Sequence, residues 1–184
     1  MRRGGTAKPL YTADERRRRD ATPWTLVQGV LAPLQFGVLL VSLALVGRYL
    51  ATGQGLWAAT ASVIAKTAAL YAIMVTGSIW EKAVFGRYLF APAFFWEDAV
   101  SMVVIALHTA SVAMLLLHLG SPAAQFTVAL LGYAAYAVNA AQFLLKLRAA
   151  RRESPRPHVA QAGSLPPETP VEAAARIAPA GGLA

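Results

Sequence analysis

The stretch WTLVQGVLAPLQFGVLLVSLALVGRYL, from Trp24 to Leu50, contains a single charged side chain, that of Arg48. An apolar run of about 20 residues or more is long enough to cross the ~30 Å hydrocarbon core of a membrane as a helix. Inside lipid such a run has to be helical, because no water is available to hydrogen-bond an open backbone. The stretch therefore predicts a transmembrane helix.

Three further apolar runs follow along the chain. Of the 184 residues, 57% are hydrophobic and 14% are charged, which is more apolar surface than a soluble globule of this size can bury. The turns at Gly53–Gly55 and Gly120–Pro122 are short, so neighbouring helices should lie antiparallel in one bundle. The sequence thus predicts an all-α membrane protein, an antiparallel four-transmembrane-helix bundle. Its spans are expected at about residues 24–50, 56–80, 98–119 and 123–147.

Positive charge is distributed unevenly around these runs. Seven lysines and arginines precede the first run, six lie from Lys146 onward, and two lie between the second and third runs. By the positive-inside rule, this pattern predicts that both termini and the connection at residues 77–98 are cytoplasmic. We expect a basic cytoplasmic N-terminal arm at residues 1–22, a transmembrane domain at 23–152, and a disordered C-terminal tail at 153–184.

Several classes of protein are excluded by composition and motifs. The chain has no cysteine, so disulfides, thiolate metal sites and cysteine nucleophiles are excluded. The net charge of +8 does not indicate nucleic-acid binding, because the cations gather at the ends of the apolar runs. The sequence also lacks a phosphate-binding glycine loop, an HExxH motif, a nucleophile elbow and a metal-spaced histidine pair. We therefore expect no metal and no cofactor.

Two ionisable side chains, Lys66 and His108, lie deep within predicted helices. Such groups are costly in lipid, and they usually face the bundle interior or a wet cavity. At 100° per residue His108 shares one helix face with Glu97, Ser101 and Ser111. His108 could link two helices or act as a ligand, and both interpretations are equally supported. For Lys66 a functional or paired role is favoured over snorkelling to the membrane surface.

Other polar side chains should lie at the same depth as Lys66 and His108. Gln35, Tyr133 and Tyr136 come from the first and fourth runs, and their convergence is a hypothesis. On the second run Lys66 and Glu81 share a polar face, so the two polar faces suggest a cleft open to the cytoplasm. Four amides are more simply interpreted as links between helices: Gln28, Gln35, Asn139 and Gln142.

The connection GSIWEKAVFGRYLFAPAFFWED, from Gly77 to Asp98, places Glu81, Glu97 and Asp98 among many aromatic side chains. Carboxyl groups that lie beside apolar walls and beside one another tend to keep a proton, which suits a general acid. The alternative is ordinary structure, with Glu81 paired to Lys82 or Arg87 and with Asp98 capping a helix. The residues alone support the two interpretations equally.

Three segments of the sequence resemble the 3-vinyl bacteriochlorophyllide hydratases of bacteriochlorophyll synthesis. They are PLYTADERRRRDATPWTLVQGVLAP (9–33), YAIMVTGSIWEKAVFGRYLFAPAFFWEDAVSM (71–102) and NAAQFLLKLRAARR (139–152), and the GSIWEK…FFWED part is the most specific. The resemblance implies a hydro-lyase that adds water across the 3-vinyl group of a chlorophyllide or bacteriochlorophyllide, giving a 3-(1-hydroxyethyl) group. It implies no cofactor.

The resemblance also implies a location and partners. The protein is expected in the bacterial inner or intracytoplasmic membrane. Its expected partners are membrane lipids, the magnesium tetrapyrrole substrate, water and other enzymes of bacteriochlorophyll synthesis, and no nucleic acid. The alternative function is a non-catalytic membrane carrier or assembly factor for tetrapyrroles. A transporter is the weakest option, because four spans without a repeat make a small permeation unit.

Within the implied reaction we expect Glu97 to be the general acid, with Glu81 or Asp98 as the base or electrostatic stabiliser. The tryptophans and phenylalanines would wall the macrocycle, Arg87 or Lys82 would pair with its propionate, and His108 could ligate its magnesium. The residues expected to bind the substrate are Trp80, Arg87, Phe94, Phe95, Trp96, His108 and Lys66.

Overall fold

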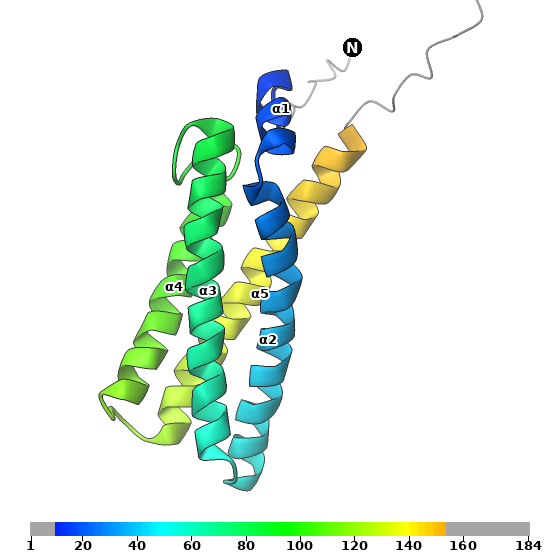
Figure 1. Cartoon of the computed structure of the whole chain (residues 1–184). Coiled ribbons are helices and arrows are strands. Elements are labelled where there is room, and N and C mark those ends of the chain that lie inside the picture. Colours follow the sequence, from blue (N-terminus) through cyan, green and yellow to red (C-terminus); the bar gives the residue numbers. More distant parts are fainter. Residues whose placement is uncertain (1–9, 154–184) are drawn as a thin grey trace, which may run out of the picture. The chain divides into compact units, whose positions relative to one another are not determined.

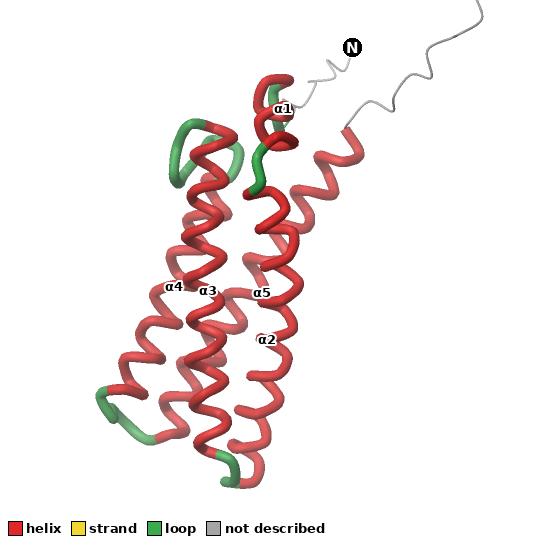
Figure 2. Tube along the Cα trace, viewed as in Figure 1, coloured by secondary structure: helices red, strands yellow, loops and turns green. Residues whose placement is uncertain are grey.

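The computed structural model describes residues 10–153, and this part of the chain consists of helices joined by turns and loops, without strands (Figures 1 and 2). Its five helices are α1 (Ala13–Ala21), α2 (Trp24–Thr52), α3 (Leu56–Phe85), α4 (Phe95–Leu116) and α5 (Pro122–Glu153). The four helices α2 to α5 are each long and apolar enough to cross a membrane. The all-α class and the presence of four candidate membrane spans are therefore confirmed. Except for Glu153, the tail expected to be disordered lies outside the described residues.

Glycines fix the ends of the first two long helices. Gly53 follows α2 with φ of +70°, and its N–H donates to the carbonyl of Tyr49 at 2.8 Å. Gly86 ends α3 in the same way, with φ of +79° and a 3.0 Å bond to the carbonyl of Lys82. Residues other than glycine rarely adopt this left-handed conformation. Because α3 continues to Phe85, Glu81 lies on a helix and not in a loop.

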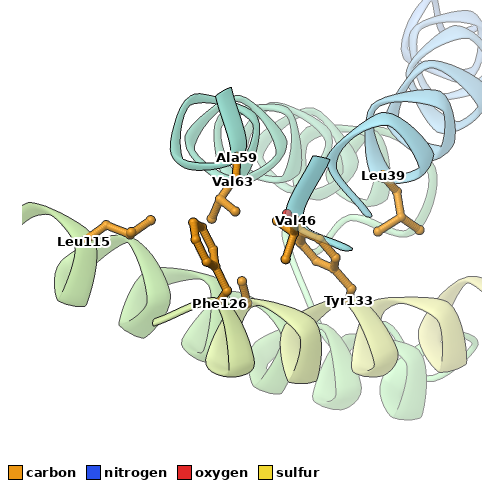
Figure 3. Close-up of a cluster of buried hydrophobic side chains, with 8 residues drawn as sticks. Leu39, Val46, Ala59, Val63, Leu115, Phe126 and Tyr133 are labelled. Atoms are coloured by element: carbon orange, nitrogen blue, oxygen red, sulfur yellow. The ribbon is translucent and has the colours of Figure 1, made fainter. Parts of the chain in front are cut away.

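All four long helices contribute to one hydrophobic core near the α2–α3 and α4–α5 turns. In Figure 3, Phe126 of α5 and Val63 of α3 point towards each other, with Leu115 of α4 and Val46 of α2 on either side. The other members of this core are Leu39, Ala59, Ala129 and Tyr133. Burial of these side chains holds the helices together at the end of the bundle away from α1.

The inner face of α4 is polar, as the sequence predicts. Glu97, Ser101, His108 and Ser111 are all buried, and none is more than 7% exposed. In the polar layer at mid-depth, the ammonium group of Lys66 lies 3.9 Å from the ring centroid of Tyr136. The burial of the four α4 side chains confirms the polar face of this helix.

Lys66 also contacts Gln35 of α2. The side-chain amide of Gln35 is oriented so that both its oxygen and its nitrogen have hydrogen-bond partners. The oxygen accepts from Lys66 Nζ at 3.1 Å, and the nitrogen donates to the carbonyl of Ala69 at 3.0 Å. A second polar contact joins Ser42 of α2 to the hydroxyl of Tyr133 on α5, at 2.5 Å. The expected convergence of polar groups from different helices is therefore confirmed.

His108 packs tightly against α5. Its Nδ1 lies 2.8 Å from the carbonyl oxygen of Val104, and a carbonyl only accepts, so Nδ1 carries the proton and donates it. A Cβ placed on Gly132 would lie 2.9 Å from this nitrogen, which is closer than real Cβ atoms approach other groups. Only glycine at position 132 therefore allows the ring of His108 to lie between α4 and α5.

Gly132→Ala is expected to lower the free energy of unfolding by about 1–3 kcal/mol, because the added methyl group overlaps the ring of His108. Gly37→Ala is the matched control, since a Cβ at Gly37 meets nothing within 4 Å. The control should be neutral or slightly stabilising, because alanine favours helix more than glycine does. Unfolding in one detergent compares the two variants. Equal unfolding midpoints would contradict the packing of His108 against Gly132.

The N-terminal arm contains a helix that the sequence reading missed. Thr12 and Glu15 cap α1 reciprocally, with bonds of 2.7 and 3.3 Å. Arg18 of this helix donates from Nε to the carbonyl of Val84 on α3 at 2.7 Å. Tyr11 is 4% exposed and stacks on Phe85, with ring centroids 5.8 Å apart. Burial raises the pKa of the Tyr11 hydroxyl above its ordinary value. The arm is thus attached to the end of α3.

Candidate functional site

Three buried carboxyl groups meet where α3 ends and α4 begins. Glu81 lies near the end of α3, whereas Glu97 and Asp98 lie in the first turn of α4. Their exposed fractions are 5%, 7% and 4%. The connection between the two helices turns the chain back on itself, and this brings together the three acids singled out in the sequence.

Glu81 and Asp98 form a pair of buried carboxyl groups that lie next to each other. Each also accepts a backbone N–H from the connection, Asp98 from Phe90 at 2.7 Å and Glu81 from Ala91 at 3.4 Å. Two adjacent buried carboxylates repel each other, so the pair favours a state in which one of the two groups holds a proton. The pair therefore combines an acid and a base side by side.

The backbone of Phe90 is held in an unusual conformation next to this pair. Its φ is +59°, the left-handed region, in which a residue with a side chain is disfavoured by roughly 1–2 kcal/mol. This conformation directs the N–H of Phe90 at Asp98, and the ring of Phe90 packs on that of Phe95 at 5.6 Å. Backbone strain of this kind gathers at functional sites.

Glu97 has a different environment from the pair. Its Oε2 accepts a hydrogen bond from Lys146 Nζ of α5 at 2.6 Å, in an ion pair in which Lys146 is 27% exposed. The ammonium group also lies 5.0 Å from the ring centroid of Phe94. A charge-assisted bond of this kind is stronger than a bond between neutral groups. Glu97 is therefore suited to be a fixed anion next to the Glu81–Asp98 pair.

The aromatic side chains divide into an inner and an outer group. Phe94 is 1% exposed and packs against Trp80, Phe85 and Phe143. The outer group, which we call the aromatic rim, consists of Tyr88, Phe90, Phe95 and Trp96. These side chains are 61%, 36%, 47% and 71% exposed. Among the expected wall residues, Phe95 and Trp96 are thus accessible, whereas Phe94 belongs to the protein core.

The cations of the connection lie beside the rim. Arg87 is exposed. Lys82 donates to the carbonyl of Gly86 at 3.0 Å and lies 5.3 Å from the ring centroid of Tyr88. The contacts of Glu81 are with Asp98 and Ala91. The geometry therefore favours the carboxyl pair over the alternative in which Glu81 is neutralised by Lys82 or Arg87.

Lys66 and His108 lie deeper in the bundle than the carboxyl groups. Their exposed fractions are 0% and 1%. At a rise of 1.5 Å per residue, His108 is about 16 Å further along α4 than Glu97. Its ring lies against Gly132 and Tyr133, and Lys66 contacts Gln35 and Tyr136. The expected site residues therefore form two groups, one at the α3–α4 connection and one at mid-depth.

Sequence reasoning missed Tyr11 and Lys146, whereas Asn139 links α5 to α4 as expected of the amides. Asn139 Nδ2 donates to Ser101 Oγ at 2.7 Å, and Ser101 donates to the carbonyl of Glu97 at 2.9 Å. One signal was present, because Asn139, Gln142 and Lys146 follow one another at intervals of three and four residues. This spacing places a polar face on the last helix. A lone tyrosine in a charged arm gives no such signal.

Matches to known proteins cover all the residues of the candidate site. The model of a family described as 2-vinyl bacteriochlorophyllide hydratase matches residues 11–149. A protein of that name from Cereibacter sphaeroides is 64% identical over 143 residues, which cover 77% of this chain and 88% of the relative. Its namesake from Rhodobacter capsulatus is 62% identical over 148 residues, which cover 80% and 85%. No solved structure matches the chain.

Proposed function

The chain belongs to the 2-vinyl bacteriochlorophyllide hydratase family, and on this basis we propose that it adds water across the vinyl group of a bacteriochlorophyllide or chlorophyllide. This is the family that the sequence resembled, under a name that numbers the vinyl group differently. The product would carry a 1-hydroxyethyl group. The observation that supports this chemistry best is the buried Glu81–Asp98 pair, which holds a proton donor beside a proton acceptor.

Hydration of a vinyl group on a conjugated ring proceeds by addition of a proton. The terminal carbon takes the proton, and the macrocycle spreads the positive charge that develops on the adjacent carbon. Water then forms a bond to that carbon and loses a proton. The reaction needs a general acid, a base and negative charge near the cation, and it consumes only water.

The Glu81–Asp98 pair can supply both proton transfers. Its protonated carboxyl group gives the proton to the vinyl group, after which two negative charges face the cation. The proton released by the attacking water returns to the pair and restores its first state. Sequence analysis favoured Glu97 as the acid, but its ion pair with Lys146 supports a role as a fixed anion.

The aromatic rim is the proposed wall for the macrocycle. Phe95 and Trp96 are exposed immediately before Glu97 and Asp98, so a ring that lies against them brings its edge near the carboxyl groups. The exposed guanidinium group of Arg87 would pair with the propionate. The burial of Lys66 and His108 supports a role in the bundle interior, and not contact with the ring or its magnesium.

The membrane arrangement is part of the proposal. The four long helices would cross the bacterial inner or intracytoplasmic membrane in antiparallel order, with both termini and the α3–α4 connection in the cytoplasm. The clustering of lysines and arginines outside the apolar runs supports this orientation. Membrane lipids, and other enzymes of bacteriochlorophyll synthesis that hand over the pigment, would be the partners.

Trp96→Ala is expected to weaken pigment binding about two- to tenfold, because an aromatic contact contributes about 0.5–1.5 kcal/mol beyond its buried area. Trp57→Ala is the matched control, since Trp57 is 83% exposed at the first turn of α3, far from the carboxyl groups. Titration of the protein with pigment in detergent, followed by absorbance, measures both affinities. Equal affinities in the two variants would contradict the placement of the macrocycle on the rim.

The proposed function is tested by incubating membranes that contain the protein with chlorophyllide or bacteriochlorophyllide, without added cofactors. A blue shift of pigment absorbance, from loss of vinyl conjugation, and a mass gain of one water are expected. Bound but chemically unchanged pigment, with both substrates tried, would instead favour the non-catalytic carrier. The same outcome would overturn the proposed hydratase.

A further inference from the structure

Two buried amide oxygens lie on α5 close to the carboxyl groups. Asn139 Oδ1 and Gln142 Oε1 are shielded from solvent and have no hydrogen-bond partner among the residues that the structure describes. Asn139 is 7% exposed, and its Nδ2 is used in the bond to Ser101. A buried carbonyl oxygen without a donor is unfavourable, especially in a membrane protein. Both oxygens therefore call for a donor that the described side chains do not supply.

The position of the two oxygens is fixed by contacts on either side of them. Asn139 bonds to Ser101 of α4, and Lys146, which lies on the same face of α5, bonds to Glu97 of α4. Gln142 lies between Asn139 and Lys146 along α5. The first turns of α4 bury Glu97, Asp98 and Ser101 and expose Phe95 and Trp96. Asn139 thus lies against the first turns of α4, and the buried oxygen of Gln142 follows it on the same face of α5.

We propose that Asn139 and Gln142 bind the water molecule that adds to the vinyl group. The inference rests on the proposed function, in which the macrocycle covers the rim and leaves the α5 side as the approach for the nucleophile. One O–H of the water would donate to an amide oxygen, and the other would donate to the ionised carboxylate of the pair. A lone pair of the water oxygen then forms the bond to the cationic carbon, and the second proton passes to the carboxylate.

A purely structural role for these amides accounts for only part of their geometry. The bond from Asn139 Nδ2 to Ser101 links α5 to α4, as expected of a polar side chain between membrane helices. It makes no use of Oδ1 or of Gln142 Oε1. A water molecule can donate one O–H to such an oxygen and the other to the carboxylate, and water is the reactant that fits.

The test uses Gln142→Met, which keeps the shape of the side chain and removes its oxygen, together with Asn139→Leu. Gln125→Met is the matched control, because Gln125 is buried on the same helix and donates to Met114 and Leu119 at 3.2 and 3.0 Å. Each variant is incubated with pigment in D2O. Mass spectrometry then measures the hydrated product and the deuterium in the recovered vinyl pigment.

The experiment measures how the cationic intermediate divides between hydrated product and vinyl pigment. In D2O the carboxyl pair delivers a deuteron to the terminal carbon, and the cation is either captured by water or loses a proton and returns as deuterated vinyl pigment. Loss of the water site should raise the ratio of vinyl exchange to hydration about three- to tenfold, the effect of about one hydrogen bond. A folding defect would lower hydration and vinyl exchange together and leave their ratio unchanged. Gln125→Met, which removes a buried amide elsewhere on α5, should therefore have the wild-type ratio.

A wild-type ratio in both Gln142→Met and Asn139→Leu would overturn the water site while leaving the hydratase intact. A raised ratio in Gln125→Met as large as that in Gln142→Met would overturn it as well. If the unmodified protein gave neither hydrated product nor deuterated vinyl pigment, the proposed function itself would fail, and the water site with it.

Discussion

Glu81→Gln and Asp98→Asn are each expected to lower the turnover number about 10²–10⁴-fold, which is the usual contribution of general acid–base catalysis. Either substitution removes a carboxyl group that can give and take a proton. Both keep the shape of the side chain and an oxygen that can accept the backbone N–H of Ala91 or Phe90. The fold and the affinity for pigment should therefore be preserved.

Turnover and pigment binding should be measured side by side for these two variants. Asp20→Asn is the control, because the side chain of Asp20 is 64% exposed and pairs with Arg19 on α1. It should have wild-type turnover. The assignment would collapse if Glu81→Gln, Asp98→Asn and Glu97→Gln all kept near-normal turnover. A loss of binding without a loss of turnover at saturation would show that the acids hold the pigment and do not transfer protons.

Lys146→Met is expected to destabilise the protein by roughly 3 kcal/mol, because it leaves Glu97 buried without its cation. This is the low end of the range for broken buried ion pairs, since the side chain of Lys146 is 27% exposed. Turnover should fall as well, because the variant lacks the ammonium group that holds Glu97 in place beside the Glu81–Asp98 pair. Chemical unfolding in detergent and the hydration assay measure the two effects.

Two further variants distinguish the ion pair from simple packing. Lys146→Arg keeps the charge, and adding Glu97→Gln to Lys146→Met removes the unpaired anion, so both should be more stable than Lys146→Met alone. Arg148→Met serves as the control, because Arg148 is an exposed cation on the same helix. If Lys146→Met unfolded at the wild-type midpoint, or if the double variant were no more stable, the pair would have no energetic role.

The features that the sequence predicted correctly are those set by one helix at a time. The apolar runs predicted α2 to α5, and the period of the helix predicted that Glu97, Ser101, His108 and Ser111 share the buried face of α4. Both follow from the membrane as solvent and from helix geometry. The end of α3 was placed five residues too early, because Trp80 and the residues after it are also typical of a membrane interface.

Features that depend on how two helices are rotated relative to each other were not predictable. The ion pair between Glu97 and Lys146 joins residues 49 positions apart on different helices. The run Phe94-Phe95-Trp96 does not show which ring points inwards until the start of α4 at Phe95 is known. Glu97 was chosen as the acid without knowledge of its partner Lys146, because the sequence alone does not show which cation lies nearest to a carboxylate.

The most direct test of the central claim is hydration in D2O and 18O-labelled water by the purified protein, with the position of each label determined in the product. The account predicts one deuterium on the terminal carbon, now a methyl group, and one labelled oxygen on the carbon next to the ring. Neither label should require a cofactor. Pigment that binds and is recovered without either label, or a hydrated product with its oxygen on the terminal carbon, would contradict it.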